Sequence, residues 1–177
     1  MASLTLLTGP RGAGKTSLCL HKAEKARADG QTVAGLLSPA RFERNYKVGI
    51  DALDLRSGQR RPLAQRRSKA TGGAPFDLSA SLKAGFAHLR QLETSNWRFD
   101  PDALAWGAEV LRQATPCDLL IIDELGPLEF ERRGGWLVAL DIITQGDYRH
   151  ALVVVRPELL EVAQNRWPWA EIWQVGG

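Results

Sequence analysis

One short segment of the sequence combines glycines, a lysine and a threonine in a spacing that could bind phosphate. The residues that fit the pattern G-x-x-x-x-G-K-[ST] are Gly9, Pro10, Arg11, Gly12, Ala13, Gly14, Lys15 and Thr16. Glycines allow the backbone to turn successive N–H groups toward one point, where they can hold phosphate oxygens. The Lys15 ammonium could then reach the β- and γ-phosphates as a catalytic group, and the Thr16 hydroxyl could ligate Mg²⁺. We therefore predict a nucleotide-binding loop at residues 9–16.

A second segment combines an apolar run with two adjacent acids. Residues 119–122 are continuously apolar, and Asp123 and Glu124 follow them directly. Ligands of open α/β sheets bind at the carboxyl ends of the strands. We therefore expect Asp123 on the Mg²⁺ side of the nucleotide, and we expect Glu124 to polarise an attacking water. The alternative is that both acids simply cap the turn that follows a strand.

Other charged residues could complete such a site. Arg156 directly follows the apolar run 151–155, so it should lie at the same edge of the sheet and could act as a catalytic residue on the γ-phosphate. The alternative is a surface arginine. Glu129 and Glu131 could line the cleft, but an exposed loop explains them equally well.

Alternating strands and helices must position these residues. The apolar pattern predicts strands at 4–7, 32–37, 97–99, 119–122, 151–155 and 170–175. It predicts helices at 14–29, near 78–92, from Asp100-Pro101 onward, at 136–143 and at 158–164. A β-hairpin is expected over residues 41–55, followed by a loop over 56–69. The predicted fold is an α/β, mostly parallel sheet with helices on both faces and an added β-hairpin.

Length and composition set limits on the class of protein. With 177 residues, 44% hydrophobic and 24% charged, the chain suits one domain spanning residues 1–177. Its cysteines and histidines are scattered without metal-binding spacing, and they are Cys19, Cys117, His21, His88 and His150. We expect a reducing, cytoplasmic location with neither a signal peptide nor a membrane span.

Basic residues gather in one stretch although the net charge is only +3. They are Arg56, Arg60, Arg61, Arg66, Arg67 and Lys69, and no acid lies between Asp54 and Asp77. Nucleic acid is not the expected ligand because no aromatic residue is interleaved with these arginines. A solvated loop or a surface for a protein partner accounts for residues 56–69.

With these motifs in view, the sequence resembles the small nucleoside-triphosphatases of the thermophile and cancer-related type. The resemblance rests on residues 9–16, on Asp-Glu-Leu-Gly-Pro-Leu-Glu at 123–129, on residues 35–58 with Arg41 before the hairpin, and on Arg98-Phe99-Asp100. It implies a RecA-like P-loop core and Mg²⁺-dependent hydrolysis of several nucleoside triphosphates, ATP and GTP included. It also implies nucleotide contacts along Leu119, Leu120, Ile121, Ile122, Asp123, Glu124, Leu125 and Gly126. The sequence departs from the family pattern at Arg156 and in its long, basic stretch 60–96.

Two other functions remain open from the residues alone. A P-loop kinase would pass the γ-phosphoryl group to a small acceptor, and the arginines at 56–69 could form its lid. Such kinases commonly carry an acid at the end of the second strand, where this chain reads Leu36-Leu37-Ser38-Pro39. A non-catalytic nucleotide-binding module is the third reading. The guanine-reading Asn/Thr-Lys-x-Asp signature is absent from the sequence, which favours broad use of triphosphates.

Overall fold

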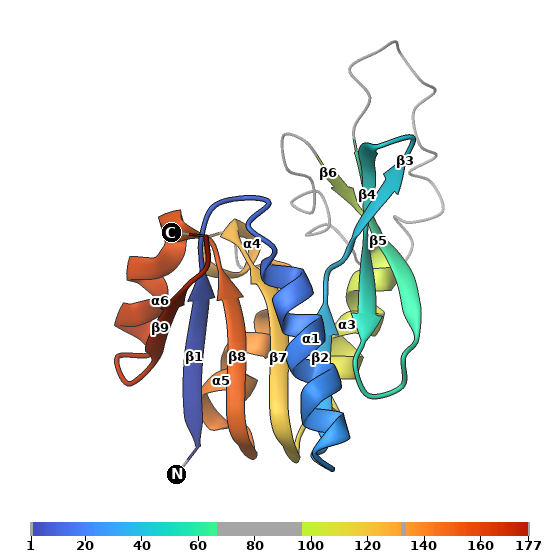
Figure 1. The fold of residues 1–177 in the computed structure, drawn as a ribbon. Coiled ribbons are helices and arrows are strands. Elements are labelled where there is room, and N and C mark those ends of the chain that lie inside the picture. Colours follow the sequence, from blue (N-terminus) through green and yellow to red (C-terminus); the bar gives the residue numbers. More distant parts are fainter. Residues whose placement is uncertain (1, 67–96, 132–133, 177) are drawn as a thin grey trace, which may run out of the picture.

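The computed structural model of the chain describes residues 2–66, 97–131 and 134–176 (Figure 1). The strands are β1 (Ser3–Thr8), β2 (Val33–Leu37), β3 (Ala40–Glu43), β4 (Tyr46–Asp54), β5 (Arg60–Arg66), β6 (Trp97–Phe99), β7 (Cys117–Leu125), β8 (Tyr148–Val155) and β9 (Glu171–Gln174). The helices are α1 (Lys15–Ala28), α3 (Pro101–Arg112), α4 (Pro127–Phe130), α5 (Leu137–Gln145) and α6 (Leu160–Arg166), with a 3₁₀ turn, η3 (Pro157–Leu159). The helix expected near residues 78–92 lies outside the described residues. None of the helices in the described ranges is both long and apolar enough to span a membrane.

The described strands form one sheet, in the order β6-β5-β4-β2-β7-β8-β1-β9, with β3 paired to β4. The block β2-β7-β8-β1-β9 is parallel, and the remaining pairings are antiparallel. This arrangement confirms the predicted, largely parallel α/β sheet. Because β8 lies between β1 and β7, the segments that follow β1 and β7 flank the carboxyl end of β8.

The central strands are apolar along their whole length because helices cover both faces of the sheet (Figure 1). In β7, Leu120 and Ile122 pack into the core on the side of α3 and α5, while Leu119 and Ile121 pack into the core on the side of α1. The face that α1 turns to the sheet consists of small residues, which are Cys19, Ala23 and Ala26. Small side chains let α1 lie close to the sheet, as its sequence predicts.

Strands β3 to β6 extend the sheet beyond β2, and we call them the antiparallel arm. The hairpin expected over residues 41–55 is confirmed as β3 and β4, joined by a turn in which Arg44 and Asn45 have φ of 45° and 66°. Positive φ at both central residues is typical of turns that match the twist of a hairpin. The expectation of a loop over residues 56–69 was wrong for Arg60–Arg66, because β5 pairs with both β4 and β6.

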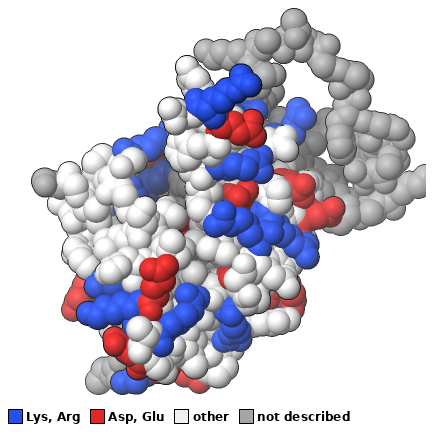
Figure 2. Space-filling model, turned by 45° about the vertical axis from the view of Figure 1, so that its right-hand side comes forward, with Lys and Arg blue, Asp and Glu red and all other residues white. Residues whose placement is uncertain are grey.

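Arginines of the arm and of its β4–β5 turn contact other residues, some within the arm and some outside it. Arg56 donates hydrogen bonds of 2.5–3.1 Å to three backbone carbonyls between residues 113 and 116, just after α3. The Arg61 guanidinium lies 4.8 Å from the centre of the Trp106 ring, and Arg60 lies 3.8 Å from the buried Asp51 carboxylate. Figure 2 shows basic and acidic side chains interspersed on this side of the molecule.

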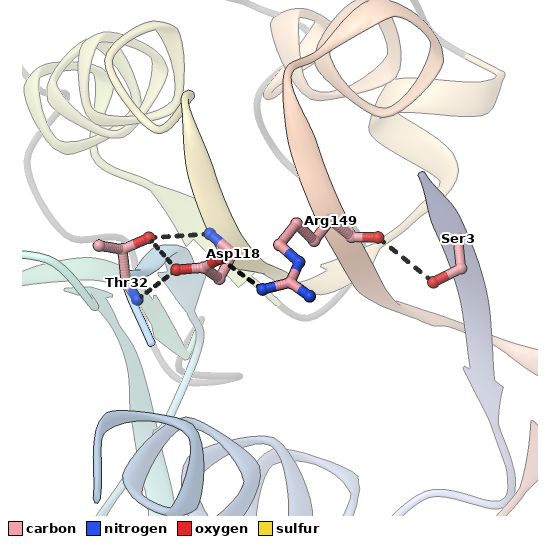
Figure 3. Close-up of polar contacts among 4 residues, drawn as sticks. All are labelled: Ser3, Thr32, Asp118 and Arg149. Carbon is pink, nitrogen blue, oxygen red and sulfur yellow. Dashed lines mark hydrogen bonds and ion pairs between the residues drawn. The ribbon is translucent and has the colours of Figure 1, made fainter. Parts of the chain in front are cut away.

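A polar cluster ties the amino-terminal ends of neighbouring strands together (Figure 3). The Asp118 carboxylate accepts hydrogen bonds from Thr32 N at 2.8 Å and Thr32 Oγ1 at 2.7 Å, and Arg149 lies 3.4 Å from its other oxygen. These bonds, with the Thr32 backbone N–H first among them, hold the pKa of Asp118 below its ordinary value. Ser3 Oγ donates to the Arg149 carbonyl, so the cluster reaches β1 as well.

Candidate active site

The glycine-rich segment at residues 9–16 forms the turn from β1 into α1, as its pattern predicts. Gly9, Gly12 and Gly14 have φ of 149°, 82° and 83°, a region that L side chains rarely adopt. Gly14 directly precedes the first residue of α1, and no described side chain caps this helix. The N–H groups of the first helical turn lack intrahelical partners, so this end of α1 favours an anion.

The Lys15 ammonium is held at the loop itself. Its Nζ atom donates to the carbonyl oxygen of Gly9 at 2.7 Å and to that of Pro10 at 2.8 Å. The side chain therefore folds back over the start of the loop instead of extending into solvent. A positive charge held beside the start of α1 favours binding of an anion such as a polyphosphate.

Asp123 lies near the carboxyl end of β7 and is only 2% exposed. Its Oδ2 atom accepts a hydrogen bond of 3.0 Å from Ser38 N, and the Ser38 hydroxyl donates to the Asp123 carbonyl at 3.3 Å. Ser38 directly follows β2 and is itself 8% exposed. The backbone after β2 therefore orients the buried carboxylate, a role for Ser38 that sequence reasoning missed.

The first turns of α1 lie near this carboxylate. The pKa of the Cys19 thiol is raised, first by burial and then by the negative charge of Asp123. Cys19 of α1 and Ile121 of β7 lie in the same buried cluster, so α1 packs against the strand that carries Asp123. Thr16 precedes Cys19 by three residues, which places the two on neighbouring parts of the same helix face. The fold thus brings the predicted metal-side residues, Thr16 and Asp123, to one region.

The remaining predicted catalytic residues, Arg156 and Glu124, lie at the carboxyl ends of β8 and β7. Arg156 directly follows β8 and precedes η3, so it lies at the carboxyl end of the strand between the loop strand β1 and the Asp123 strand β7. Glu124 belongs to β7 through its backbone, and its side chain is outside the part of the molecule that the structure describes. Arg11 is exposed at the loop.

Glu129 is buried and accepts hydrogen bonds from nearby backbone N–H groups. It is 8% exposed, and its two carboxylate oxygens accept hydrogen bonds of 2.9 Å from Gly126 N and Trp136 N. These bonds fix the short helix α4 after β7. Of the two alternatives left open for these acids, the exposed loop is wrong for Glu129, whereas Glu131 is exposed.

The oxygen donors at this edge suit Mg²⁺. The Thr16 hydroxyl and the Asp123 carboxylate are hard oxygen ligands, the type that Mg²⁺ prefers. Within the described ranges, no group of three or more His, Cys, Asp and Glu side chains comes together.

A glycine-rich loop between β1 and α1, facing an aspartate from a strand two positions away, defines the P-loop class of nucleotide-binding folds. A family described as NTPase matches residues 5–156. The chain therefore belongs to the NTPase family. The matched region ends before α6 and β9.

Individual proteins support this assignment. Nucleoside-triphosphatase THEP1 of Methanopyrus kandleri is 29% identical over 127 residues, which cover 71% of this chain and 59% of that protein. Nucleoside-triphosphatase THEP1 of Pyrobaculum aerophilum is 32% identical over 127 residues, with coverage of 71% and 58%. The matched part of this chain thus spans about three fifths of these relatives' length.

Solved structures share the fold. The solution structure of a human cancer-related nucleoside triphosphatase superposes with a TM-score of 0.67 at 22% identity, covering 99% of this chain and 89% of that chain. The crystal structure of THEP1 from the hyperthermophile Aquifex aeolicus superposes with a TM-score of 0.63 at 14% identity, covering 99% and 90%. The predicted resemblance to this group is confirmed.

Proposed function

We propose that this protein hydrolyses nucleoside triphosphates, ATP and GTP among them, to the diphosphate and phosphate in a Mg²⁺-dependent reaction. The observation that carries the proposal is the convergence of three features at one sheet edge: the loop at residues 9–16, the first turns of α1, and the buried Asp123 carboxylate. Membership of the NTPase family supports the same reaction. In this proposal the loop would hold the polyphosphate, and the acid would serve the metal.

Each residue receives a distinct role in this proposal. The N–H groups of the loop and Lys15 bind the phosphates, and Arg156 contacts the γ-phosphate from the end of β8. Thr16 and Asp123 would hold Mg²⁺, which neutralises phosphate charge when it is bound. Glu124, next to Asp123 in sequence, accepts a proton from water as the water oxygen bonds to the γ-phosphorus and the bond to the bridging oxygen breaks.

We expect water, and not a second substrate, to accept the γ-phosphoryl group. Strand β2 is followed by Ser38, whose backbone N–H is bonded to Asp123, and no carboxylate occupies the end of β2 where kinases commonly hold an acceptor.

We also propose a cytoplasmic setting, because the described cysteines, Cys19 and Cys117, are buried free thiols.

We further propose that nucleic acid is not the ligand of the basic stretch. Arg56 is bonded to backbone carbonyls, Arg61 lies on a tryptophan ring, and Arg60 faces Asp51. These contacts leave less of the arm's charge for phosphates, so a protein partner is the better proposal for this surface. RNA binding that survives about 0.2 M salt would contradict it, because non-specific phosphate contacts weaken steeply with salt.

Separate substitutions of the two acids test the proposed roles. Glu124→Gln keeps the shape and removes the base, so we expect kcat to fall by about 10²–10⁴-fold, roughly 3–5 kcal/mol, with nucleotide affinity near wild type. Asp123→Asn should weaken both Mg²⁺-dependent binding and turnover. The matched control is Glu131→Gln. Glu131 directly follows α4 and is exposed, so this substitution should leave kcat and nucleotide affinity unchanged.

Steady-state phosphate release and equilibrium nucleotide binding over a Mg²⁺ titration measure these effects. A near-wild-type kcat in Glu124→Gln would contradict the assignment of the base. Since both oxygens of Glu129 accept backbone hydrogen bonds, that residue is a poor replacement for it.

A further inference from the structure

The last described residues of the chain run along the phosphate-binding loop. Strand β9 pairs with β1 in parallel, with Thr5 opposite Glu171 and Thr8 opposite Gln174. The ladder continues past β9, because Val175 N donates a hydrogen bond of 2.9 Å to the Thr8 carbonyl. Figure 1 shows β9 beside β1, with its end level with the turn into α1. The chain is thus paired up to the residue before the loop.

At Gly9 the two segments come into direct contact. A Cβ atom added to Gly9 would lie 2.2 Å from the carbonyl oxygen of Val175, much closer than non-bonded atoms approach. The first residue of the loop is therefore packed against the backbone of residue 175 with no space for a side chain. The glycine is required there by the neighbouring segment as well as by its own φ of 149°.

Gly176 makes a second contact farther along the loop. It has φ of 79°, and a Cβ atom added to it would lie 3.0 Å from the Ala13 side chain and 3.8 Å from Pro10 Cγ. Residues 175 and 176 together therefore adjoin the loop at positions 9, 10 and 13. Position 13 lies between the two glycines, Gly12 and Gly14, whose positive φ values shape the loop.

We propose that residues 175–176 brace the phosphate-binding loop and position it for the nucleotide, so that seating of this segment and nucleotide binding are coupled. The inference rests on the proposed function of the loop. N–H groups of a loop bind phosphate well only when the loop holds one geometry. A displacement of Ala13 by residue 176 would therefore weaken nucleotide binding although residue 176 does not contact the nucleotide. Val175 and Gly176 are positioning residues in this account.

Strand β9 is held lightly enough for such coupling to matter. It is an edge strand whose four residues are all exposed. Beyond its pairing with β1, a contact of 4.7 Å between Lys22 Nζ and the Trp173 ring attaches it to α1. Local stability is lowest where few buried contacts hold a segment. Nucleotide binding should therefore order β9, and loosening of β9 should weaken binding.

Substitution of Gly176 tests the proposal against a matched control. Gly176→Ala places a methyl group 3.0 Å from Ala13, whereas Gly30→Ala places one at nearly the same φ, 76°, with nothing within 4 Å. Both variants should lose a similar part of their stability, because each puts an alanine at a positive φ. We expect Gly176→Ala alone to weaken binding of a Mg²⁺-loaded, non-hydrolysable ATP analogue, by about 3- to 30-fold in calorimetry.

A second substitution separates contact from general damage. Ala13→Gly removes the Cβ atom that the new methyl group meets. The double variant, Gly176→Ala with Ala13→Gly, should therefore bind the analogue more tightly than expected when the fold-changes in affinity of the two single variants are multiplied. Equal affinities for wild type, Gly176→Ala and Gly30→Ala would overturn the brace and leave the proposed function standing. Equal weakening by the two glycine variants, or strict additivity in the double variant, would also overturn it. Absence of binding by the wild type would reject the proposed function itself, and the brace with it.

Discussion

Strand β2 approaches β7 so closely at Gly35 that we expect any side chain there to disrupt the sheet and the site together. Gly35 has φ of 114°, and a Cβ atom added to it would lie 1.9 Å from the carbonyl oxygen of Ile121 and 2.8 Å from its carbonyl carbon. Both residues are in the middle of the β2–β7 pairing, where Gly35 is opposite Ile121. Because the atoms it would meet are backbone, no rotamer change can relieve the contact.

The cost of Gly35→Ala can be built from two contributions. Forcing alanine to a strongly positive φ costs about 1–3 kcal/mol, and overpacking of a filled interior costs about 1–3 kcal/mol. We therefore expect the free energy of unfolding to fall by about 2–6 kcal/mol, a large share of the ~5–15 kcal/mol typical of a domain. Since Ser38 follows β2 directly and bonds to Asp123, ATP affinity should fall as well.

Urea denaturation followed by circular dichroism measures the stability change, and calorimetry measures ATP affinity. The control is Gly58→Ala, in the turn between β4 and β5, where φ is 75° and nothing lies within 4 Å of the added Cβ. That variant should lose only the cost of its φ, about 1–2 kcal/mol. Similar unfolding free energies for the two variants would refute the close approach of β2 and β7.

Three further predictions concern groups outside the loop. Burial raises the pKa of the Cys117 thiol to about 11, so at mildly alkaline pH iodoacetamide should alkylate it far more slowly in the native protein than in denaturant; equal rates would contradict its burial. Burial also lowers the pKa of His150, against an opposing effect of Glu171, so the unfolded chain binds a proton at higher pH than the native one. The free energy of unfolding should then fall as pH drops below about 6.5, and His150→Gln should flatten that fall in urea titrations. Arg56→Ala removes hydrogen bonds to three carbonyls and should cost about 1–3 kcal/mol, more than Arg112→Ala, which removes only an exposed ion pair.

Patterns among neighbouring residues are sufficient to predict most strands of the parallel part of the sheet, β2-β7-β8-β1-β9. The apolar runs of β1, β7 and β8 predict buried strands because both sheet faces are covered, and the structure confirms them. Asp100 followed by proline predicts the start of α3, where the Asp100 carboxylate accepts a hydrogen bond from Ala103 N at 2.9 Å. These features depend on residues that are close in sequence, so a single chain reveals them.

Features that depend on distant partners were not predicted. Strand β5 contains several arginines and Pro62, and it exists because β4 and β6 pair with it on either side. The hydrogen bonds between Ser38 and Asp123 join residues 85 positions apart. The residues around Ser38 in the sequence therefore do not indicate that it orients the Asp123 carboxylate. Glu129 looked like a loop acid because its backbone partners, Gly126 and Trp136, are recognisable only once α4 has formed.

Phosphate release from a panel of nucleoside triphosphates, with and without Mg²⁺, tests the central claim most directly. We expect release from ATP, GTP and other triphosphates without any added acceptor, dependence on Mg²⁺, and loss of release in Lys15→Ala. That substitution removes the ammonium now bonded to the Gly9 and Pro10 carbonyls. Absence of release from every triphosphate, or an unchanged rate in Lys15→Ala, would contradict the claim that this loop is the site of nucleotide hydrolysis.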